Sequence, residues 1–375
     1  MAASTGIALL GAGIFAKEAH LPALAVLGDV APPLRAVYSR SEKSAHDLAA
    51  AAAVALKLSE SPSVYHDTGG DASSNLDALL ARPDITAVIV VLPITLQPSI
   101  VLKALAAGKH VISEKPVAPD VKQGLDLIYT YNQQYKPKGL VWRVAENFEA
   151  EPGYRKAGEI VRSGKIGEVK FFKAVVVNHI DKDSKWYKSP WRTIPDYQGG
   201  FLLDGGVHTI AALRVMLPHP LTHLSGFASL AKDYLAPHDT IHAIVKAADH
   251  FHGTAEFTWA SPTKARPQAD GFVITGTDGW VAVNMEWAPT PRVIVKVRSL
   301  VKVEGKSDEE HEEVLELPSS GVAAELGSFF GTIGGKDDGL GLGDPLKALG
   351  DVAFIQAALN SDGQLVDLNK LLQEG

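Results

Sequence analysis

A short apolar stretch that ends in closely spaced glycines constrains this 375-residue chain more than any other feature. Residues 6–10 have the composition of a buried strand, and Gly-Ala-Gly-Ile-Phe-Ala follows at positions 11–16. Glycines at this spacing permit a tight turn and let a pyrophosphate approach the backbone at the N-terminus of the following helix. A glycine turn that binds nothing is the alternative, and the strand before it and the helix after it disfavour that reading. The predicted dinucleotide contacts are Gly11, Gly13, Ile14 and Phe15.

Strand and helix patterns alternate through the first 147 residues. The run at 85–92 (Ile-Thr-Ala-Val-Ile-Val-Val-Leu) is β-branched and apolar throughout, as in a central parallel strand that is covered on both faces. Such alternation favours right-handed βαβ units and a doubly wound parallel sheet. Further strands are predicted at 34–39, 110–113 and 140–145, and helices at 41–58, 97–107 and 120–135.

The pattern changes after a boundary near residues 147–152. Long strands are predicted at 169–178, 242–248, 253–259, 272–277, 279–283 and 293–303, and helices at 154–163, 206–217 and 344–359. We expect a hairpin tip at the acidic residues 307–313 and a surface loop at the glycine-rich residues 331–343. The sequence therefore predicts a first domain of α/β class at 1–147 and a second, α+β domain with a large, mainly antiparallel sheet at 148–375.

Composition excludes several kinds of protein. The chain has no cysteine, so it has neither disulfides nor thiolate metal centres. Its net charge of −7 and the absence of a basic run argue against nucleic acid or a membrane surface as a partner. Among the 13 histidines, His238 and His242 could share a helix face and His250 and His252 a strand face, but no Glu-x-x-His pattern or cysteine accompanies them, so we expect no metal. The N-terminus lacks the basic start of a signal peptide, and the longest apolar run is too short to span a bilayer, so a cytoplasmic location is expected.

Two further motifs place chemically useful side chains near predicted element ends. Lys115 follows the predicted strand 110–113, where an ammonium group could stabilise an alkoxide, although Glu-Lys-Pro alone is more often a surface turn. Asp204 is a candidate N-cap of a helix that runs to residue 217, and His208 lies four residues later. A carboxylate beside an imidazole suits a general base, while a capping Asp and a packed His are the alternative.

Three motifs, taken together and in this order, resemble a known family. They are Gly-x-Gly-x-x-x-x-x-x-His20-x-Pro22 from Gly11, Ala-Gly-Lys-His-Val-x-x-Glu-Lys-Pro ending at Pro116, and Gly-Gly-x-x-x-Asp-x-Gly-x-His ending at His208. The chain is similar to the glucose–fructose oxidoreductase / inositol dehydrogenase / rhizopine-catabolism (Gfo/Idh/MocA) family over nearly its whole length.

The resemblance implies an N-terminal Rossmann domain, an open-faced second domain and a nicotinamide cofactor between them. It also implies hydride transfer to or from a sugar, polyol or vicinal diol, with Lys115, Asp204 and His208 as catalytic residues that also touch the substrate. An exposed sheet face must be covered, so a homodimer or homotetramer is expected. Two alternatives stay open: a regulator that senses the cofactor without turnover, and an NAD-dependent glycosidase.

The chain departs from the family pattern at two places. Pro93-Ile-Thr-Leu-Gln97 stands where many members have Asn-x-x-His, and Asn147-Phe-Glu149 stands where many have Asn-x-Arg. Because of these two departures, the resemblance predicts the fold more closely than it predicts the substrate. The resemblance makes Leu92, Pro93, Gln97, Glu114 and Lys115 candidate cofactor contacts, and Asn147 a candidate substrate contact.

Aromatic residues gather just before the third motif. Flat rings stack on the C–H faces of sugars, and an arginine binds hydroxyls or a phosphate. A loop that is merely anchored on the core is an equally good explanation of the cluster. The predicted substrate contacts in this stretch are Trp186, Tyr187, Trp191, Arg192 and Tyr197.

The end of the second predicted strand bears on the choice between NADP and NAD. An NAD-specific site has an acidic residue there to bind both ribose hydroxyls, whereas this chain has Ser39 and Arg40, with Lys43 shortly after. A hydroxyl donor and a guanidinium suit a 2′-phosphate. We therefore predict NADP as the preferred cofactor. The alternative is that Arg40 and Lys43 are solvated charges and that NAD serves equally well.

Overall fold

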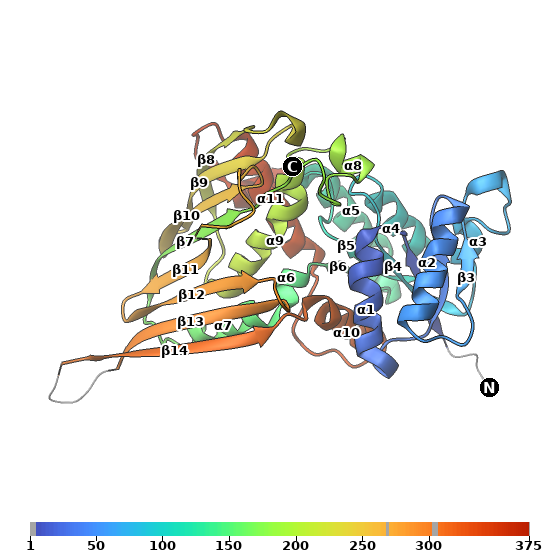
Figure 1. Ribbon diagram of the computed structural model, residues 1–375, viewed down its shortest axis with the longest axis horizontal. Helices are drawn as coiled ribbons and strands as arrows, with labels where there is room; N and C mark the ends of the chain where they lie inside the picture. The colour runs from blue at the N-terminus through green and yellow to red at the C-terminus, as the bar shows by residue number, and fades with distance from the viewer. Residues whose placement is uncertain (1–4, 268–269, 302–306, 375) are drawn as a thin grey trace. The chain divides into compact units, whose positions relative to one another are not determined.

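The computed structural model describes residues 5–267, 270–301 and 307–374. The chain forms two compact units, each described here by itself. The first contains the residues up to Asn147 together with Val322–Ala348, and the second contains Phe148–Gly321 together with the residues from Leu349 onward. Figure 1 labels their helices and strands.

The first unit is built on a six-stranded sheet in which all neighbouring strands are parallel. Its strand order, β3-β2-β1-β4-β5-β6, is that of the doubly wound dinucleotide-binding fold, which confirms the predicted class. The short β3 was not predicted, because three residues carry too little pattern. The strands are β1 (Gly6–Leu10), β2 (Leu34–Tyr38), β3 (Ser63–Tyr65), β4 (Ile85–Val90), β5 (His110–Glu114) and β6 (Trp142–Ala145).

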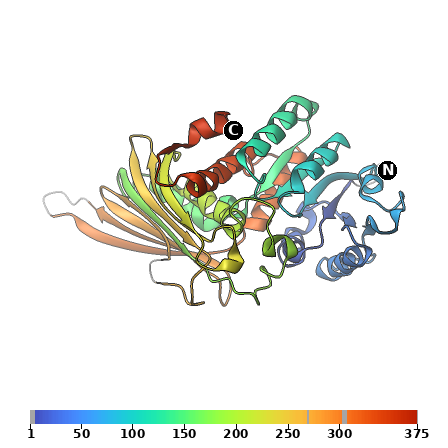
Figure 2. The same ribbon diagram turned by 90° about the horizontal axis from the view of Figure 1, so that it is seen from above.

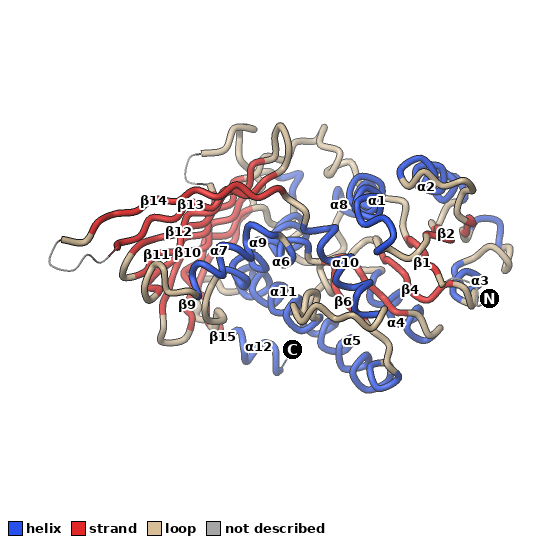
Figure 3. Tube along the Cα trace, turned by 90° about the horizontal axis from the view of Figure 1, so that it is seen from below, coloured by secondary structure: helices blue, strands red, loops and turns tan. Residues whose placement is uncertain are grey.

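Helices cover both faces of this sheet, which explains why β1 and β4 are buried almost throughout. Figure 3 shows α1 and α2 on one face and α4 and α5 on the other. The helices are α1 (Leu21–Leu27), preceded by the π-helical turn η1 (Ala16–His20), α2 (Glu42–Ala55), α3 (Leu76–Leu80), α4 (Gln97–Ala106) and α5 (Val121–Gln134). Short 3₁₀ turns occupy η2 (Gly28–Val30), η3 (Thr68–Gly70) and η4 (Lys136–Lys138).

Helix α10 (Gly321–Ile333) completes the first unit, which corrects the prediction that all of 148–375 forms the second domain. Phe329 and its neighbours on α10 are buried in the same core as Ile7 and Leu9 of β1. The Arg143 guanidinium of β6 donates to the Ser328 hydroxyl at 2.9 Å. The helix therefore returns to the first unit because its apolar face completes that core.

The glycine-rich stretch 331–343 also belongs to this unit. Its first residues finish α10, and the carbonyl of Gly343 accepts a hydrogen bond from the amide of Val144 at 2.9 Å. The predicted surface loop is therefore tied at its far end to strand β6.

The second unit contains a nine-stranded sheet in the order β14-β13-β12-β11-β7-β10-β9-β8-β15. Neighbouring strands are antiparallel except β7 and β10, so the prediction of a large, mainly antiparallel sheet is confirmed. Figure 2 shows the strong twist of these strands. They are β7 (Val169–Val177), β8 (His223–Ser229), β9 (Thr240–Ala247), β10 (Phe251–Thr258), β11 (Gly271–Gly276), β12 (Gly279–Glu286), β13 (Arg292–Val301), β14 (Glu309–Pro318) and β15 (Val366–Asp367).

One face of this sheet is covered by helices and the other is open. In Figures 1 and 3, α7 (Pro152–Arg162), α9 (Phe201–Met216) and α11 (Pro345–Asn360) lie on one side, and no described helix of this unit covers the opposite side. Side chains along β9 and β13 alternate between buried and exposed, as this arrangement requires. The shorter helices are α6 (Asn147–Ala150), α8 (Pro190–Thr193), η5 (Asp233–Leu235) and α12 (Leu368–Glu374).

Two predictions in the second unit were wrong. The acidic residues 307–313 lie largely in strand β14, where carboxylates pair with the cations of β13; Arg298 contacts Glu310 at 3.0 Å. Helix α9 begins at Phe201 instead of 206, because Gly200 adopts a positive φ of 52° immediately before it. Asp204 therefore lies inside the helix and is not its N-cap. Residues 302 and 303 of the predicted strand 293–303 lie outside the described residues.

No helix within the described ranges has the length and apolar character that crossing a membrane requires.

Candidate functional site

The glycine turn after β1 has the geometry that a pyrophosphate needs. Gly11 has φ +113°, and a β-carbon there would lie 2.0 Å from the carbonyl oxygen of Val91, so only glycine fits. A β-carbon on Gly13 would meet no atom within 4 Å, and Gly13 is exposed. The helical segment starts directly afterwards with Ile14 and Phe15. Gly11 thus shapes the turn, and Gly13 leaves space in front of helix-terminal amides, which fits a dinucleotide.

The end of β2 carries the residues predicted to choose between NADP and NAD. Ser39 is half-buried and Arg40 is exposed, with no side-chain partner for its guanidinium among the described residues. Lys43 instead pairs with Asp47 on the surface of α2, at 2.7 Å. The ammonium of Lys43 thus has a carboxylate partner on its own helix, and Arg40 and Lys43 both remain candidate cofactor contacts.

The structure adds a carboxylate that the sequence did not place at this strand end. Asp67 follows β3, and it accepts a hydrogen bond from the hydroxyl of Tyr38 at 2.5 Å. Its amide donates to the carbonyl of Arg40 at 3.2 Å. Burial and the neighbouring Asp67 raise the pKa of Tyr38 well above its ordinary value, so the phenol stays a donor to this carboxylate.

The loop after β4 brings a buried amide with unsatisfied hydrogen-bonding groups to the same edge of the sheet. Gln97 begins α4 and is only 1% exposed, yet neither its side-chain oxygen nor its nitrogen has a partner among the described residues. A buried polar group without a partner is unfavourable. Leu92 and Pro93, in the loop before it, are half-buried. Its buried amide leaves Gln97 a candidate cofactor contact.

Lys115 directly follows the last residue of β5. Parallel strands end at one edge of a sheet, so this residue lies at the edge that also carries the turn of Gly11. The preceding residue, Glu114, is buried, and its carboxylate contacts Nε2 of the fully buried His20 at 2.6 Å. This contact ties the end of β5 to the helical segment that follows the glycine turn.

Helix α9 carries Asp204 and His208 one turn apart. Asp204 is nearly buried and accepts a hydrogen bond from Nε of Arg192 at 2.7 Å. The imidazole of His208 stacks on the ring of Phe148, with centroids 4.7 Å apart and an interplanar angle of 26°. Phe148 follows Asn147, the first residue of α6, so the predicted substrate contact lies next to the aromatic ring that orients the candidate base.

A buried ion-pair cluster fixes this helix. The Arg214 guanidinium contacts Asp351 of α11 at 2.9 Å and Glu149 of α6 at 2.8 Å. Burial lowers the pKa of Arg214, but the two carboxylates outweigh that effect and raise it. This cluster was not predicted from the sequence, since its members are separated by up to 202 positions (351 − 149).

The aromatic residues before α9 pack on Arg192 and on one another. The guanidinium carbon lies 4.0 Å from the ring centroid of Trp191 and 5.3 Å from that of Trp186. Tyr197 is buried against Trp191, with centroids 5.9 Å apart, and its hydroxyl has no partner among the described residues. Tyr187 packs edge-on against Tyr234. Three of these aromatic residues, Trp186, Trp191 and Tyr197, thus form one cluster beside the Arg192–Asp204 pair.

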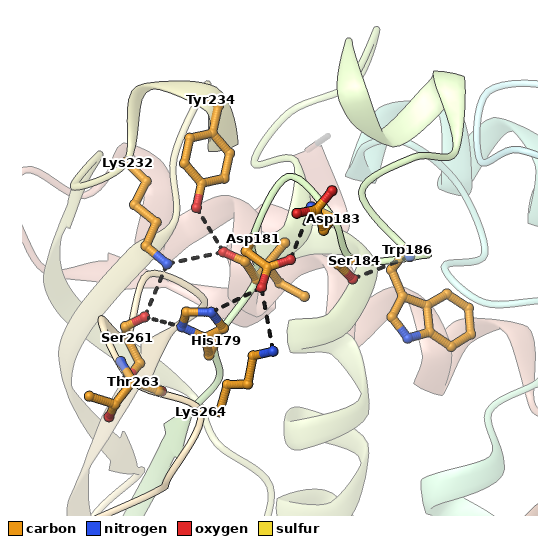
Figure 4. A network of polar contacts seen from close by, with 11 residues as sticks. His179, Asp181, Asp183, Ser184, Trp186, Lys232, Tyr234, Ser261, Thr263 and Lys264 are labelled. Carbon is orange, nitrogen blue, oxygen red and sulfur yellow. Dashed lines mark hydrogen bonds and ion pairs between the residues drawn. The ribbon is translucent and has the colours of Figure 1, made fainter.

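A polar network anchors the segment that carries this cluster (Figure 4). Lys232 and Tyr234 both donate to the carbonyl of Ile180, at 3.0 and 2.9 Å. Asp181 contacts His179 at 3.4 Å and Lys264 at 3.8 Å. A cavity of about 370 Å³ lies beside the network and is lined by polar and charged residues, among them His179, Asp181 and Lys264. None of the predicted site residues lines it.

Two family models match most of the chain. Residues 5–137 match the oxidoreductase family with an NAD-binding Rossmann fold, and residues 154–282 match the GFO/IDH/MocA C-terminal domain. The chain is also 39% identical to the dehydrogenase FPY6 of Fusarium mangiferae over 366 residues, which is 95% of this chain and 96% of that protein. The chain belongs to the GFO/IDH/MocA family.

A solved structure and a further relative are also similar to most of the chain. An oxidoreductase from Thermotoga maritima has a crystal structure that superposes with a TM-score of 0.80 at 29% identity, over 98% of this chain and all of that one. The dTDP-3,4-didehydro-2,6-dideoxy-alpha-D-glucose 3-reductase of Streptomyces violaceoruber is 26% identical over 323 residues, 81% of this chain and 85% of that enzyme. The predicted family, fold and nicotinamide cofactor class are thereby confirmed.

Proposed function

We propose that this protein is an NAD(P)-dependent oxidoreductase that transfers hydride between nicotinamide and a CH–OH group of a sugar, polyol or vicinal diol. One observation carries the proposal: Lys115 directly follows strand β5 at the same sheet edge as the Gly11–Gly13 turn, in an NAD-binding Rossmann domain. A relative whose name describes a 3-reductase of a dTDP-linked deoxysugar supports a carbohydrate substrate.

Each candidate residue has a defined chemical role. A nicotinamide cofactor held at the Gly11–Gly13 turn would supply the hydride acceptor or donor. In the oxidation direction, a ring nitrogen of His208 accepts the proton of the substrate hydroxyl, and the carbon that loses hydride becomes a carbonyl carbon. The Lys115 ammonium stabilises the alkoxide charge that develops on the substrate oxygen. Asp204, one helical turn before His208, binds a neighbouring hydroxyl or orients the base.

The cofactor preference is part of this proposal. Arg40 is exposed beside Ser39 at the end of β2, and Lys43 is engaged by Asp47. We therefore assign recognition of a 2′-phosphate to Arg40 and Ser39, and expect NADP to be preferred over NAD.

A homodimer or homotetramer is proposed from the open face of the nine-stranded sheet. Phe171, Phe227 and Ile244 are 50%, 62% and 63% exposed there. Apolar side chains in such numbers on one face are typical of an interface. A second copy of this face would cover them, because closed symmetric pairs are the commonest oligomers. Sedimentation velocity at micromolar concentration should give a dimer or tetramer, and a stable monomer would contradict this assignment.

The activity is tested by following reduced-nicotinamide absorbance with a panel of aldoses, polyols and diols and both cofactors. Net cofactor reduction is expected for at least one neutral substrate. Product without net reduction would indicate internal recycling of hydride, as in an NAD-dependent glycosidase. Cofactor binding with no product would favour a regulator.

Lys115→Met provides the matched variant for this experiment. It keeps a long unbranched side chain and removes only the charge. We expect turnover to fall about 100-fold or more, as for loss of a charged group that stabilises the transition state, while the cofactor still binds. Near-normal turnover would remove Lys115 from the mechanism.

A further inference from the structure

The environment of Arg192 differs from the one that the sequence suggested, in which its guanidinium is free to bind a ligand. A free guanidinium at this place would bind an acidic or phosphorylated sugar. Instead, its Nε donates to the carboxylate of Asp204 at 2.7 Å, and both side chains are largely buried, 13% and 9% exposed. The two opposite charges compensate each other before any substrate arrives.

The surrounding aromatic rings hold the guanidinium in this position. Trp191 and Trp186 have their ring centroids 4.0 and 5.3 Å from it, and Ser189 accepts from Nη1 at 3.4 Å. A cation over an indole face is attracted by the π-electrons. Arg192 thus occupies the indole faces that the sequence suggested for a sugar. The indoles therefore affect the substrate only by holding the guanidinium in place.

The segment that carries these residues is itself fixed. The hydroxyl of Thr193 donates to the carbonyl of Tyr187 at 2.5 Å, and Tyr187 packs edge-on against Tyr234, with centroids 5.5 Å apart. Tyr234 in turn donates to the carbonyl of Ile180 at the start of the segment, beside the network in Figure 4. Moving Arg192 away from Asp204 would disturb this packing as well as the ion pair.

Tyr197 supplies a second, independent observation. Its side chain is 93% buried (100 − 7), and its hydroxyl has no partner among the described residues. Burial and the nearby Asp204 raise its pKa far above the ordinary value, so the phenol is neutral and retains its proton. It is therefore a hydrogen-bond donor that lacks an acceptor beside the ion pair.

We infer that Arg192, Asp204 and Tyr197 form an electroneutral hydroxyl-binding subsite that selects an uncharged polyol over acidic and phosphorylated sugars. This inference rests on the proposed function and narrows its substrate class. One substrate hydroxyl donates to the Asp204 carboxylate, and an adjacent oxygen accepts from the Arg192 guanidinium or the Tyr197 hydroxyl. Vicinal hydroxyls supply both a donor and an acceptor, whereas an ionised carboxylate or phosphate supplies only acceptors.

An anionic group meets electrostatic repulsion at this subsite. An anion that accepts from the Arg192 guanidinium lies close to the Asp204 carboxylate, which Nε of Arg192 already binds at 2.7 Å in a poorly solvated environment. A neutral polyol leaves the ion pair intact and exchanges water hydrogen bonds for protein hydrogen bonds. Selection against charge therefore comes from Asp204, and selection for hydroxyls comes from all three residues.

The test compares ligands matched except for charge: D-glucitol with D-gluconate, xylitol with xylonate, and D-glucose with D-glucose 6-phosphate. Dissociation constants are measured by quenching of tryptophan fluorescence and by calorimetry, so the result does not depend on turnover. Wild-type protein should bind the neutral member of a pair about tenfold or more tightly, the difference expected from one charge-assisted hydrogen bond. Equal or tighter binding of the charged member would overturn the inference.

Two variants change the charge of the subsite in opposite directions. Asp204→Asn leaves Arg192 uncompensated and should reverse the preference towards gluconate. Arg192→Met keeps the contact with the indoles, removes the cation of the pair, and should favour D-glucosamine over D-glucose. Asp183→Asn is the control, because it removes an equal charge from the same segment at a side chain that is 97% exposed. Unchanged preferences in both folded charge variants would overturn the inference.

This outcome is separable from that of the proposed function. Wild-type protein that binds glucitol in preference to gluconate but reduces neither cofactor would refute the proposed oxidoreductase activity and support the subsite. Protein that reduces cofactor with gluconate in preference to glucitol would refute the subsite and support the activity.

Discussion

Replacing each glycine of the turn with alanine should separate the folding role of Gly11 from the ligand-binding role of Gly13. At Gly11 the backbone has φ +113°, and a β-carbon would lie 2.0 Å from the Val91 carbonyl oxygen. At Gly13 a β-carbon would meet nothing within 4 Å, and φ lies outside the left-handed range. The same added methyl group therefore has opposite consequences two residues apart.

The expected magnitudes follow from these environments. For Gly11→Ala, backbone strain of about 1–3 kcal/mol and overpacking of about 1–3 kcal/mol add to about 2–6 kcal/mol of lost stability. That is a large part of a typical free energy of unfolding. For Gly13→Ala, stability should change by less than about 0.5 kcal/mol, as at other surface positions. Its methyl group occupies the space where a pyrophosphate approaches, so the dissociation constant should rise about tenfold or more.

Urea denaturation followed by circular dichroism measures the first effect, and calorimetric titration with NADP⁺ and NAD⁺ measures the second. Gly13→Ala is the stability control for Gly11→Ala, because both add one methyl group to the same turn. A Gly13→Ala protein that binds both cofactors as tightly as wild type would refute the assignment of this turn to the pyrophosphate. A Gly11→Ala protein of wild-type stability would refute the predicted clash with Val91.

Three further changes test other parts of the structure. Phe329→Ala should lower the free energy of unfolding by about 3–5 kcal/mol in urea, because its ring is fully buried in the first unit; a loss of less than about 1 kcal/mol would contradict that packing. Burial raises the pKa of Glu151 above its unfolded value, although Ser319 and Gly321 donate hydrogen bonds to its carboxylate. Ionisation of Glu151 therefore destabilises the folded state, and the free energy of unfolding falls as the pH rises above about 4.3. Glu151→Gln should therefore show a flatter stability–pH profile than wild type in denaturation from pH 4 upward, and parallel profiles would argue against this assignment. Arg40→Ala should raise the Michaelis constant for NADP⁺ about tenfold (~1.4 kcal/mol) with little effect on that for NAD⁺, whereas a wild type that uses NAD⁺ equally well would show that Arg40 binds no phosphate.

The sequence by itself determined those structural elements that depend only on residues close together in the chain. The run from Ile85 is apolar on both faces, so it could only be a covered strand, and β4 is found at Ile85–Val90. Gly11 marks a turn because no other residue type permits its backbone, and Gly13 leaves open the space that a pyrophosphate needs. Lys115 was placed at a strand end by the same reasoning. Such features depend on neighbouring residues, which the sequence displays directly.

Tertiary structure decided which distant segments meet. The apolar face of α10 could have joined either core, and only the packing of Phe329 with the first unit shows its place. From the sequence alone, the acidic residues 307–313 were predicted to be a solvated hairpin tip. In the structure most of them lie in β14, where the cations of β13 lie opposite and pair with their carboxylates. Arg192 was predicted as a ligand contact, yet the fold first pairs it with Asp204. The partner of a charged side chain or of an apolar helix face cannot be predicted from that residue or helix alone. The energies of burial and of ion pairing depend on which distant residues the fold brings into contact with it.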